Sequence, residues 1–417
     1  MIRVSIDNVA RELASRLNQT GGRLFIPGGP GEPLGLLEAF RREPELAAGL
    51  TFVGAPVPGI NRTDWAALHA TARAEGTFLS GDWRPSFEAG RFALRPMTWF
   101  QAFGWLETTP LEAAVFVVSP PDAEGTVSLG VASDLAPAVI HRPGVFKVAI
   151  VNPNMPRVQG PVFDIADFDL VAEDDTPLLT YEAGTLDPAF DRIKAHLQAL
   201  LTPGASVQFG LGKAGVAAVA ALEGMKGLRI HSGMVAGPLR AALDSGALTE
   251  VVTGLAAGDA ALYALCGSDE RIRFEPSGFT HDVRTLAAIP KLVAVNSALE
   301  VDLFGQANAE FQGGRQISGT GGLTDFLRGA RLSEGGLPIL ALPASAKGGA
   351  VTRIVPRLPQ TAVSVTRADV GLVITEHGVA DLRGLTLDGR AEALIAVADP
   401  GHRDELANAW ADLRKTL

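Results

Sequence analysis

The sequence predicts an α/β protein made of two related open domains, each with a mainly parallel sheet. Short apolar runs rich in β-branched residues alternate with helical segments, and the same order of runs occurs twice along the chain. Continuous apolar strands that alternate with helices are typical of parallel sheets covered on both faces.

In the first half, predicted strands begin at Leu24, Thr51, Ala114 and Lys147, and a helix is expected over residues 34–42. The second half repeats this plan in four matched segments. GGRLFIPGGPGEPLGLLEAF matches GASVQFGLGKAGVAAVAAL, LTFVGAPVPG matches LRIHSGMVAGP, AVFVVSPPDAEGTVSLG matches LVAVNSALEVDLFGQAN, and KVAIVNPNMP matches GLVITEHGVAD. Two copies of one open domain would form a ligand cleft between them.

The chain has 417 residues, which exceeds the size at which a single core usually stops growing. We therefore expect domains at 1–185 and 186–417, with the boundary in the segment LDPAFDRIKAHLQALLTPG, which is typical of a helix that ends in a Pro-Gly turn. The content of 47% hydrophobic and 20% charged residues indicates a globular enzyme rather than a disordered chain.

The formal net charge is −10, and the basic residues form no run, so we expect no nucleic-acid partner. The lone cysteine, Cys266, excludes an internal disulfide and suits a reducing compartment. The N-terminus has no uninterrupted apolar stretch and the apolar runs are short, so we expect a cytoplasmic protein with no membrane anchor. A homodimer is the expected assembly.

Two glycine-rich segments are candidate ligand loops. ISGTGGLTDFLRGA, at 317–330, contains Gly319, Gly321 and Gly322 before an expected helix that Thr324 could cap. Such a loop can present backbone N–H groups to an anion, although many glycine-rich turns are only structural. Gln208, Gly210 and Gly212 stand in a similar strand-to-helix turn, where a ligand site and a plain tight turn are equally supported.

Several side chains are candidates for catalysis. His231 follows an expected strand, where it could act as a base, but a hydrogen-bonded structural histidine is more common. Glu300 and Asp302 alternate on a strand and share one face. Glu376 ends a strand before a glycine turn, where it could be catalytic or pair with Arg383.

The seven histidines are scattered, so no metal site is expected. The chain also lacks a G-x-S-x-G segment, which argues against a serine hydrolase of the α/β-hydrolase type.

The segments ALEVDLFGQANAE, ISGTGGLTDFLRGA, ALPASAKGG, TRIVPRL and VITEHGVADLRG closely resemble the C-terminal domain of the acetyl-CoA hydrolase/transferase family. The first half is similar too, through IPGGPGEP, VGAPVPGINRTDW and VSPPDAEGTVSLG. The resemblance implies two related α/β domains with the active site between them, and coenzyme A or acyl-CoA as substrate. It also implies that both glycine turns and Lys347 take part in coenzyme A binding.

Family members use a glutamate that attacks the acyl-CoA thioester and then carries coenzyme A as a glutamyl thioester. That glutamate stands in a segment similar to residues 230–234, where this chain has Gly233. A second departure is Thr280 before His281, where many family transferases have an Asn-His pair.

Three functions follow from the resemblance. The first is transfer of coenzyme A between small carboxylic acids, with Glu376 or Glu300 as the nucleophile. The second is thioester hydrolysis by a water admitted at Gly233, with His231 or Glu376 as the base. The third is a non-catalytic acyl-CoA-binding subunit. Aromatic residues of the first domain, including Trp65, Trp83 and Trp99, could line the acyl pocket or belong to the core.

Overall fold

The computed structural model describes residues 2–18, 21–182, 184, 187–237, 239–359 and 362–417. The chain divides into two compact units. Unit 1 comprises Met1–Glu182, Gly233–Ala236 and Val252–Thr280, and unit 2 comprises Ala183–Ser232, Gly237–Val251 and His281–Leu417. The boundary expected from the sequence, between residues 185 and 186, lies outside the described residues.

The helices alternate with the strands along the chain. In unit 1 they are α1 (Ile6–Leu17), α2 (Leu34–Arg42), α3 (Arg84–Glu88), α4 (Trp99–Thr108), α5 (Pro137–Ile140), α9 (Ala260–Ser268) and α10 (Ser277–Thr280). In unit 2 they are α6 (Ala189–Leu200), α7 (Lys213–Ala220), α8 (Leu239–Asp244), α11 (Val283–Ala288), α12 (Leu323–Leu332), α13 (Leu387–Val397) and α14 (Arg403–Arg414).

The first large sheet has eight strands, and every neighbouring pair is parallel. Its order is β1 (Ile2–Arg3), β10 (Leu170–Glu173), β8 (Phe146–Val151), β6 (Ala113–Val118), β2 (Arg23–Phe25), β3 (Thr51–Val53), β4 (Arg73–Gly76) and β5 (Phe92–Leu94). All six residues of β6 are buried, as expected for a central strand that is covered on both faces.

The second large sheet also has eight strands. Its order is β16 (Ile272–Phe274), β14 (Leu248–Thr253), β12 (Leu228–His231), β11 (Ser206–Phe209), β17 (Leu292–Asn296), β22 (Leu337–Ala341), β26 (Leu372–Thr375) and β27 (Gly378–Asp381). The pairs from β12 to β26 are parallel, and β27 folds back antiparallel on β26.

Short strands complete the fold. They are β7 (Thr126–Ser128) with β9 (Val162–Asp164), β13 (Met234–Ala236) with β15 (Leu255–Ala257), β18 (Glu300–Asp302) with β19 (Ala307–Asn308) and β25 (Ile354–Val355), β20 (Phe311–Gln312) with β21 (Arg315–Gln316), and β23 (Ser345–Ala346) with β24 (Val351–Thr352).

The order of strands confirms an α/β fold with two large, mainly parallel sheets of the same plan. In the first sheet the chain runs from β2 through β3, β4 and β5 on one side and then through β6, β8 and β10 on the other. In the second sheet it runs from β11 through β12, β14 and β16 on one side and then through β17, β22 and β26 on the other. Three of the four expected sequence matches agree with this plan. The fourth, which matched β8 with the segment of β26, is wrong. In the strand order, β8 of the first sheet is equivalent to β22 of the second, and β10 is equivalent to β26. Apolar strand sequences resemble one another, so similarity alone misaligned this pair.

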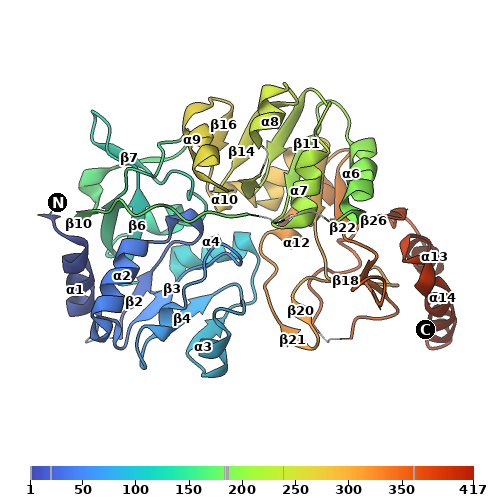
Figure 1. Cartoon of the computed structure of the whole chain (residues 1–417), viewed down its shortest axis with the longest axis horizontal. Helices are drawn as coiled ribbons and strands as arrows, with labels where there is room; N and C mark the ends of the chain where they lie inside the picture. Colours follow the sequence, from blue (N-terminus) through green and yellow to red (C-terminus); the bar gives the residue numbers. More distant parts are fainter. Residues whose placement is uncertain (1, 19–20, 183, 185–186, 238, 360–361) are drawn as a thin grey trace. The chain divides into compact units, whose positions relative to one another are not determined.

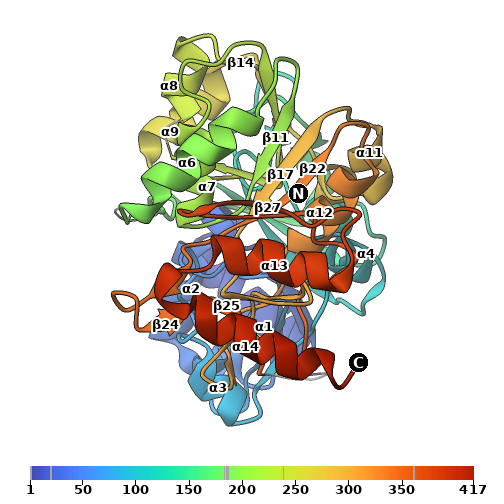
Figure 2. The same ribbon diagram turned by 90° about the vertical axis from the view of Figure 1, so that its right-hand side faces the viewer.

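Helix sequences explain why these segments fold locally. In α1, Ser5 accepts a hydrogen bond from the Asn8 amide, and the apolar residues recur every three or four positions on the buried face. Helix α2 spans the segment that the sequence predicts. Figure 1 shows α1 and α2 side by side in unit 1, and Figure 2 shows α13 and α14 side by side in unit 2, with α13 also against β27.

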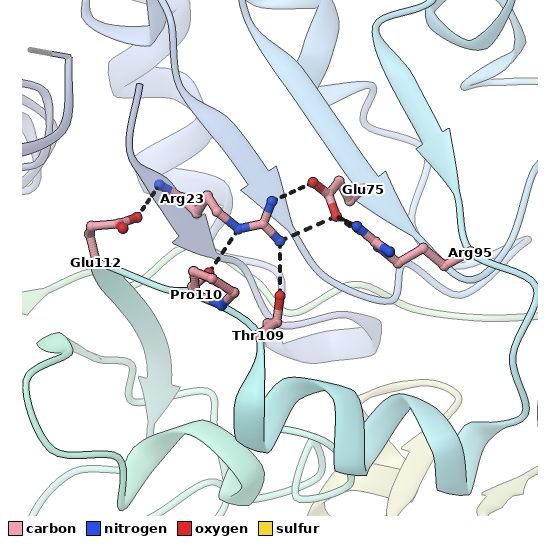
Figure 3. A network of polar contacts seen from close by, with 6 residues as sticks. All are labelled: Arg23, Glu75, Arg95, Thr109, Pro110 and Glu112. Carbon is pink, nitrogen blue, oxygen red and sulfur yellow. Dashed lines mark hydrogen bonds and ion pairs between the residues drawn. The ribbon is translucent and has the colours of Figure 1, made fainter. Parts of the chain in front are cut away.

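A network of polar contacts joins Arg23, the first residue of β2, and the segment before β6 to Glu75 on β4 and to Arg95, which follows β5 (Figure 3). The guanidinium of Arg23 donates to both carboxylate oxygens of Glu75, to the Pro110 carbonyl at 2.8 Å and to the Thr109 hydroxyl at 3.1 Å. Arg95 donates to Glu75 at 2.8 Å. Burial by itself raises the pKa of Glu75, but the hydrogen bonds from both arginines outweigh it and hold that pKa below its ordinary value.

Candidate functional site

The reversal in strand order of the second sheet lies between β11 and β17, and open α/β sheets bind ligands beside such a point. Gln208 on β11 and Asn296 on β17 form a reciprocal amide pair there, with donor–acceptor distances of 2.8 and 3.3 Å. Both side chains are buried. The pair fixes the side-chain orientation of both residues and joins the two strands.

A glycine turn follows β11 at this point. The Gly210 amide donates to the Val295 carbonyl at 3.1 Å, and a Cβ on Gly210 would lie 3.0 Å from Oδ1 of Asn296. Gly212 has a φ of 91°, which favours glycine, and is the N-cap of α7. Gln208, Gly210 and Gly212, the three residues expected from the sequence, therefore lie around one strand end. Such a strand end is a suitable place for a ligand, but the close approach of Gly210 to Asn296 also gives its glycine a structural reason.

His231 is the last residue of β12, beside β11, and its side chain is buried. Burial, and to a smaller extent the nearby His231, lowers the pKa of His281 to about 3. His281 is therefore a neutral imidazole at physiological pH. Its ring centroid lies 4.7 Å from that of Phe326 on α12. The two histidines thus lie close to each other in unit 2.

The loop at 317–322 leads into α12, and Gly322 is the N-cap of this helix. Gly321 has a φ of 52°. A Cβ on Gly322 would lie 2.6 Å from Cδ2 and Nε2 of His281, so only glycine lets the helix start approach the imidazole this closely. The expectation that Thr324 caps the helix is wrong, because Thr324 lies inside its first turn. The loop is half-buried at Gly319 and buried at Gly321.

Glu376 directly follows β26, as expected for a strand-end carboxylate. Its Oε2 accepts a hydrogen bond from the Ala344 amide at 2.8 Å, and its Oε1 lies 3.8 Å from Nε2 of His377. The expected alternative of a pair with Arg383 is wrong, because Arg383 pairs with Asp381. Glu376 therefore anchors the segment after β22 and keeps one oxygen beside an imidazole.

Glu300 and Asp302 on β18 have structural partners. Oε2 of Glu300 accepts from Nδ2 of Asn308 at 2.9 Å. Asp302 is fully buried, and its carboxylate accepts from the amides of Phe304 and Gln306. Both carboxylates thus organise the turn between β18 and β19.

The remaining expected residues lie in other segments. Thr280 ends α10 in unit 1, is fully buried, and donates its hydroxyl to the Pro276 carbonyl at 3.4 Å. Lys347 is exposed in the turn between β23 and β24, with a left-handed φ of 52°. The carbonyl of Gly233 accepts from the amides of Gly254 and Leu255 at 3.2 and 3.1 Å, next to the pairing of β13 with β15.

Two residues of this site were absent from the expected set, Asn296 and His281. Asn296 ends an otherwise apolar strand, LVAVN, and a polar residue at that edge is a signal that could have identified it. The contact of His281 with Gly322 joins residues far apart in the sequence, so no local pattern could have revealed it.

Within unit 1, a small cavity lies beside β3 and β4. Its wall includes Trp65 and Trp83, which were expected as pocket or core residues, together with the buried Glu32 and Asn61. Glu32 accepts from Nδ2 of Asn61 at 2.9 Å and from Nε1 of Trp65 at 2.8 Å. Trp99 instead packs on Phe78 at a ring distance of 5.6 Å.

The described residues include no group of three or more His, Cys, Asp or Glu side chains that could hold a metal ion. Over the same residues, no helix combines the length and the apolar character that crossing a membrane requires.

The chain is similar to known proteins along nearly its whole length. Residues 258–410 match the acetyl-CoA hydrolase/transferase C-terminal domain. The 4-hydroxybutyrate coenzyme A transferase of Clostridium kluyveri is 30% identical over 96% of both chains. The succinyl-CoA:cyclohexane-1-carboxylate CoA transferase of Geobacter metallireducens is 34% identical over 72% of this chain and 71% of its own.

Solved structures share the fold. RipA from Yersinia pestis superimposes with a TM-score of 0.89 and 26% identity, and the match covers 99% of this chain and 100% of that one. The 4-hydroxybutyrate CoA-transferase of Porphyromonas gingivalis gives a TM-score of 0.79 and 27% identity over 100% and 98% of the two chains.

Proposed function

Because the chain belongs to the acetyl-CoA hydrolase/transferase family, we propose that it transfers coenzyme A between small carboxylic acids. The observation that carries this proposal is the polar strand end in unit 2, where the Gln208–Asn296 pair adjoins a glycine turn. Backbone amides at such turns can stabilise the oxyanion of a reacting thioester, a contribution of about 3 kcal/mol per donor.

Glu376 is the proposed nucleophile. Its carboxylate would attack the thioester carbon and expel the coenzyme A thiolate, which leaves an acyl-glutamyl anhydride. The thiolate would then attack the glutamyl carbonyl, release the first carboxylic acid as its carboxylate, and form a glutamyl thioester. An acceptor carboxylate would reverse these two steps and regenerate Glu376. The contact with the Ala344 amide supports this role because it fixes the direction of the carboxylate.

Trapping tests this assignment. Incubation with acetyl-CoA followed by borohydride should reduce a glutamyl thioester at Glu376, which peptide mass spectrometry detects. Glu376→Gln should abolish both the mass change and transfer to a second acid. Glu405→Gln, at an exposed position on α14, is the matched control and should change neither. A mass change at another carboxylate would contradict the choice of Glu376.

Gly233 favours a second candidate function, hydrolysis of the thioester. We propose that Gly233 stands where the family has its glutamate, so this chain has no carboxylate side chain at that position. A water molecule admitted there would attack the thioester carbon, and His231 would take its proton. Release of free thiol without an acceptor acid, slowed by His231→Ala, would support hydrolysis over transfer.

The variant Gly233→Glu examines the family position directly. If the rest of the site accepts the family nucleophile, this change should raise coenzyme A transfer at least about tenfold. Binding of acyl-CoA without turnover, in both the native protein and the variant, would instead indicate a non-catalytic binding subunit. A panel of acyl-CoAs, assayed with and without acetate, would identify the acyl group.

A further inference from the structure

Glu310 is a buried acid that the proposed reaction does not use. It lies between β19 and β20, and its side chain is 8% exposed. Its Oε2 accepts from the Ser364 hydroxyl at 2.7 Å, and its Oε1 accepts from Nε2 of Gln316 at 3.2 Å. A buried carboxylate held by two neutral donors is costly in free energy, so its contacts need an explanation.

These contacts converge on the start of the loop at 317–322. The Glu310 carbonyl accepts from the Ile317 amide at 2.7 Å, so both the backbone and the side chain of Glu310 reach this segment. Gln316 donates to the Glu310 carboxylate and also to the Ser318 carbonyl at 3.1 Å. Gln316 therefore connects the buried acid to the loop.

A second set of hydrogen bonds, with Ser364 and Asn308, connects Glu310 to the residues before the β20–β21 hairpin. Ser364 donates to Glu310, and its Oγ accepts from the Ala309 amide at 3.0 Å. Oδ1 of Asn308 accepts from the amides of Glu310 and Phe311 at 3.1 and 2.9 Å. The residues before the β20–β21 hairpin thus form a fixed support, and Glu310 links that support to the residues after the hairpin.

The far end of the loop has its own support, because Gly322 lies against His281. The loop is therefore fixed at its start by Glu310 and at its end by the imidazole. Gly319 and Gly321, between these two points, have no Cβ to restrict their backbone, so the direction of their amides depends on the two ends.

We propose that Glu310 is a positioning residue that fixes the glycine loop at 317–322 in the conformation that presents its amides to the substrate. The position of the loop is a property of unit 2 alone, whereas its effect on turnover rests on the proposed function. The two can be measured separately.

The loop is tested by proteolysis. Arg315 is exposed in β21, so trypsin cleavage after it, followed by peptide mass spectrometry of the folded protein, reports opening of this segment. Glu310→Ala should accelerate that cleavage at least about tenfold. Ser364→Ala should act in the same direction, and Glu310→Gln should restore much of the protection because one oxygen remains to accept from Gln316.

The matched control is Asp388→Ala in the same unit, which removes a carboxylate that accepts from Trp410 and Arg414. Asp388→Ala should lower thermal stability without accelerating cleavage after Arg315. Equal acceleration by both alanine variants, or none by Glu310→Ala, would overturn the proposal.

Turnover of acyl-CoA gives the second readout. Glu310→Ala should lower kcat about tenfold with little change in KM, because a displaced loop weakens contacts made in the transition state. Glu310→Gln should recover most of kcat, whereas a loss caused only by instability would follow thermal stability and include Asp388→Ala. If the native protein shows no turnover, the proposed function fails, and the proteolysis still decides the role of Glu310.

Discussion

The two large sheets share one strand order, but the points where that order reverses differ in chemistry. After β2 the chain continues with Pro27, Gly28 and Gly29, and Oδ1 of Asn61 accepts from the Gly29 and Val57 amides, each at 2.7 Å. In the second sheet, the amide pair of Gln208 and Asn296 holds the strand ends.

This difference shows that a repeated fold does not repeat a site. In unit 1 the polar side chain at the reversal joins one loop to another, whereas in unit 2 it joins two strands beside a glycine turn and a pair of histidines. The chemistry depends on a few residues at strand ends, which can change without altering the apolar pattern that defines the sheet.

The largest expected effect concerns His281 in unit 2. In the folded protein its pKa is about 3, below the ordinary value of 6.5. The contribution of neutral His281 to the free energy of unfolding is therefore complete above pH 6.5 and is lost as the pH falls toward 3. The loss should reach about 4 to 5 kcal/mol over that range, at 1.36 kcal/mol for each pKa unit. Urea unfolding at several pH values checks this. His281→Gln should remove the slope, and an unchanged slope would contradict the assignment.

Asp134, a buried acid of unit 1, should show the opposite slope. Burial raises its pKa from 3.8 to about 6. Its contribution to stability is therefore complete below pH 3.8 and is lost as the pH rises through 6, by about 3 kcal/mol in total. Asp134→Asn should flatten the unfolding free energy between pH 4 and 6 relative to the native protein. If that variant retains the native slope, another group titrates there.

A substitution at Gly322 tests the close approach in unit 2. Gly322→Ala should reduce turnover of acyl-CoA about 100-fold, or about 2.7 kcal/mol in activation free energy, because the new Cβ displaces His281 or the helix start. Gly104→Ala is the control, since a Cβ there meets nothing within 4 Å. Native turnover in Gly322→Ala would show that the site tolerates movement of the loop.

Breaking the amide pair should cost somewhat less. Gln208→Leu leaves the buried amide of Asn296 without its partner, which should lower the free energy of unfolding by about 2 kcal/mol. In a double-mutant cycle with Asn296→Leu, the combined loss should be smaller than the sum of the two single losses. Additive losses would mean that the two side chains do not stabilise each other.

The smallest effect is expected for the network around Arg23 in the first sheet. Arg23→Met removes the hydrogen bonds to Glu75, Thr109 and Pro110 and should lower the free energy of unfolding by about 1 kcal/mol. Turnover per folded molecule should stay at the native value, as measured by an acyl-CoA assay after correction for the folded fraction. A change in kcat would indicate that this network influences the site.

The sequence by itself determined the α/β class and much of its local structure. Apolar runs such as the one that forms β6, alternating with helical segments, predict a covered parallel sheet, and the helix at 34–42 follows from its own periodicity. The glycine turns at 210–212 and 319–322 were also evident in the sequence, and the positive φ of Gly212 and Gly321 favours glycine there.

The tertiary structure decided the rest. Only the order of the strands shows that β8 corresponds to β22, and only packing places His281 against Gly322 and Glu376 against the Ala344 amide. Glu300 was a sound candidate as a carboxylate on a strand, yet its hydrogen bond to Asn308 could not be read from the sequence. A periodic pattern records which face of an element is buried, whereas contacts between distant residues depend on how separate elements pack.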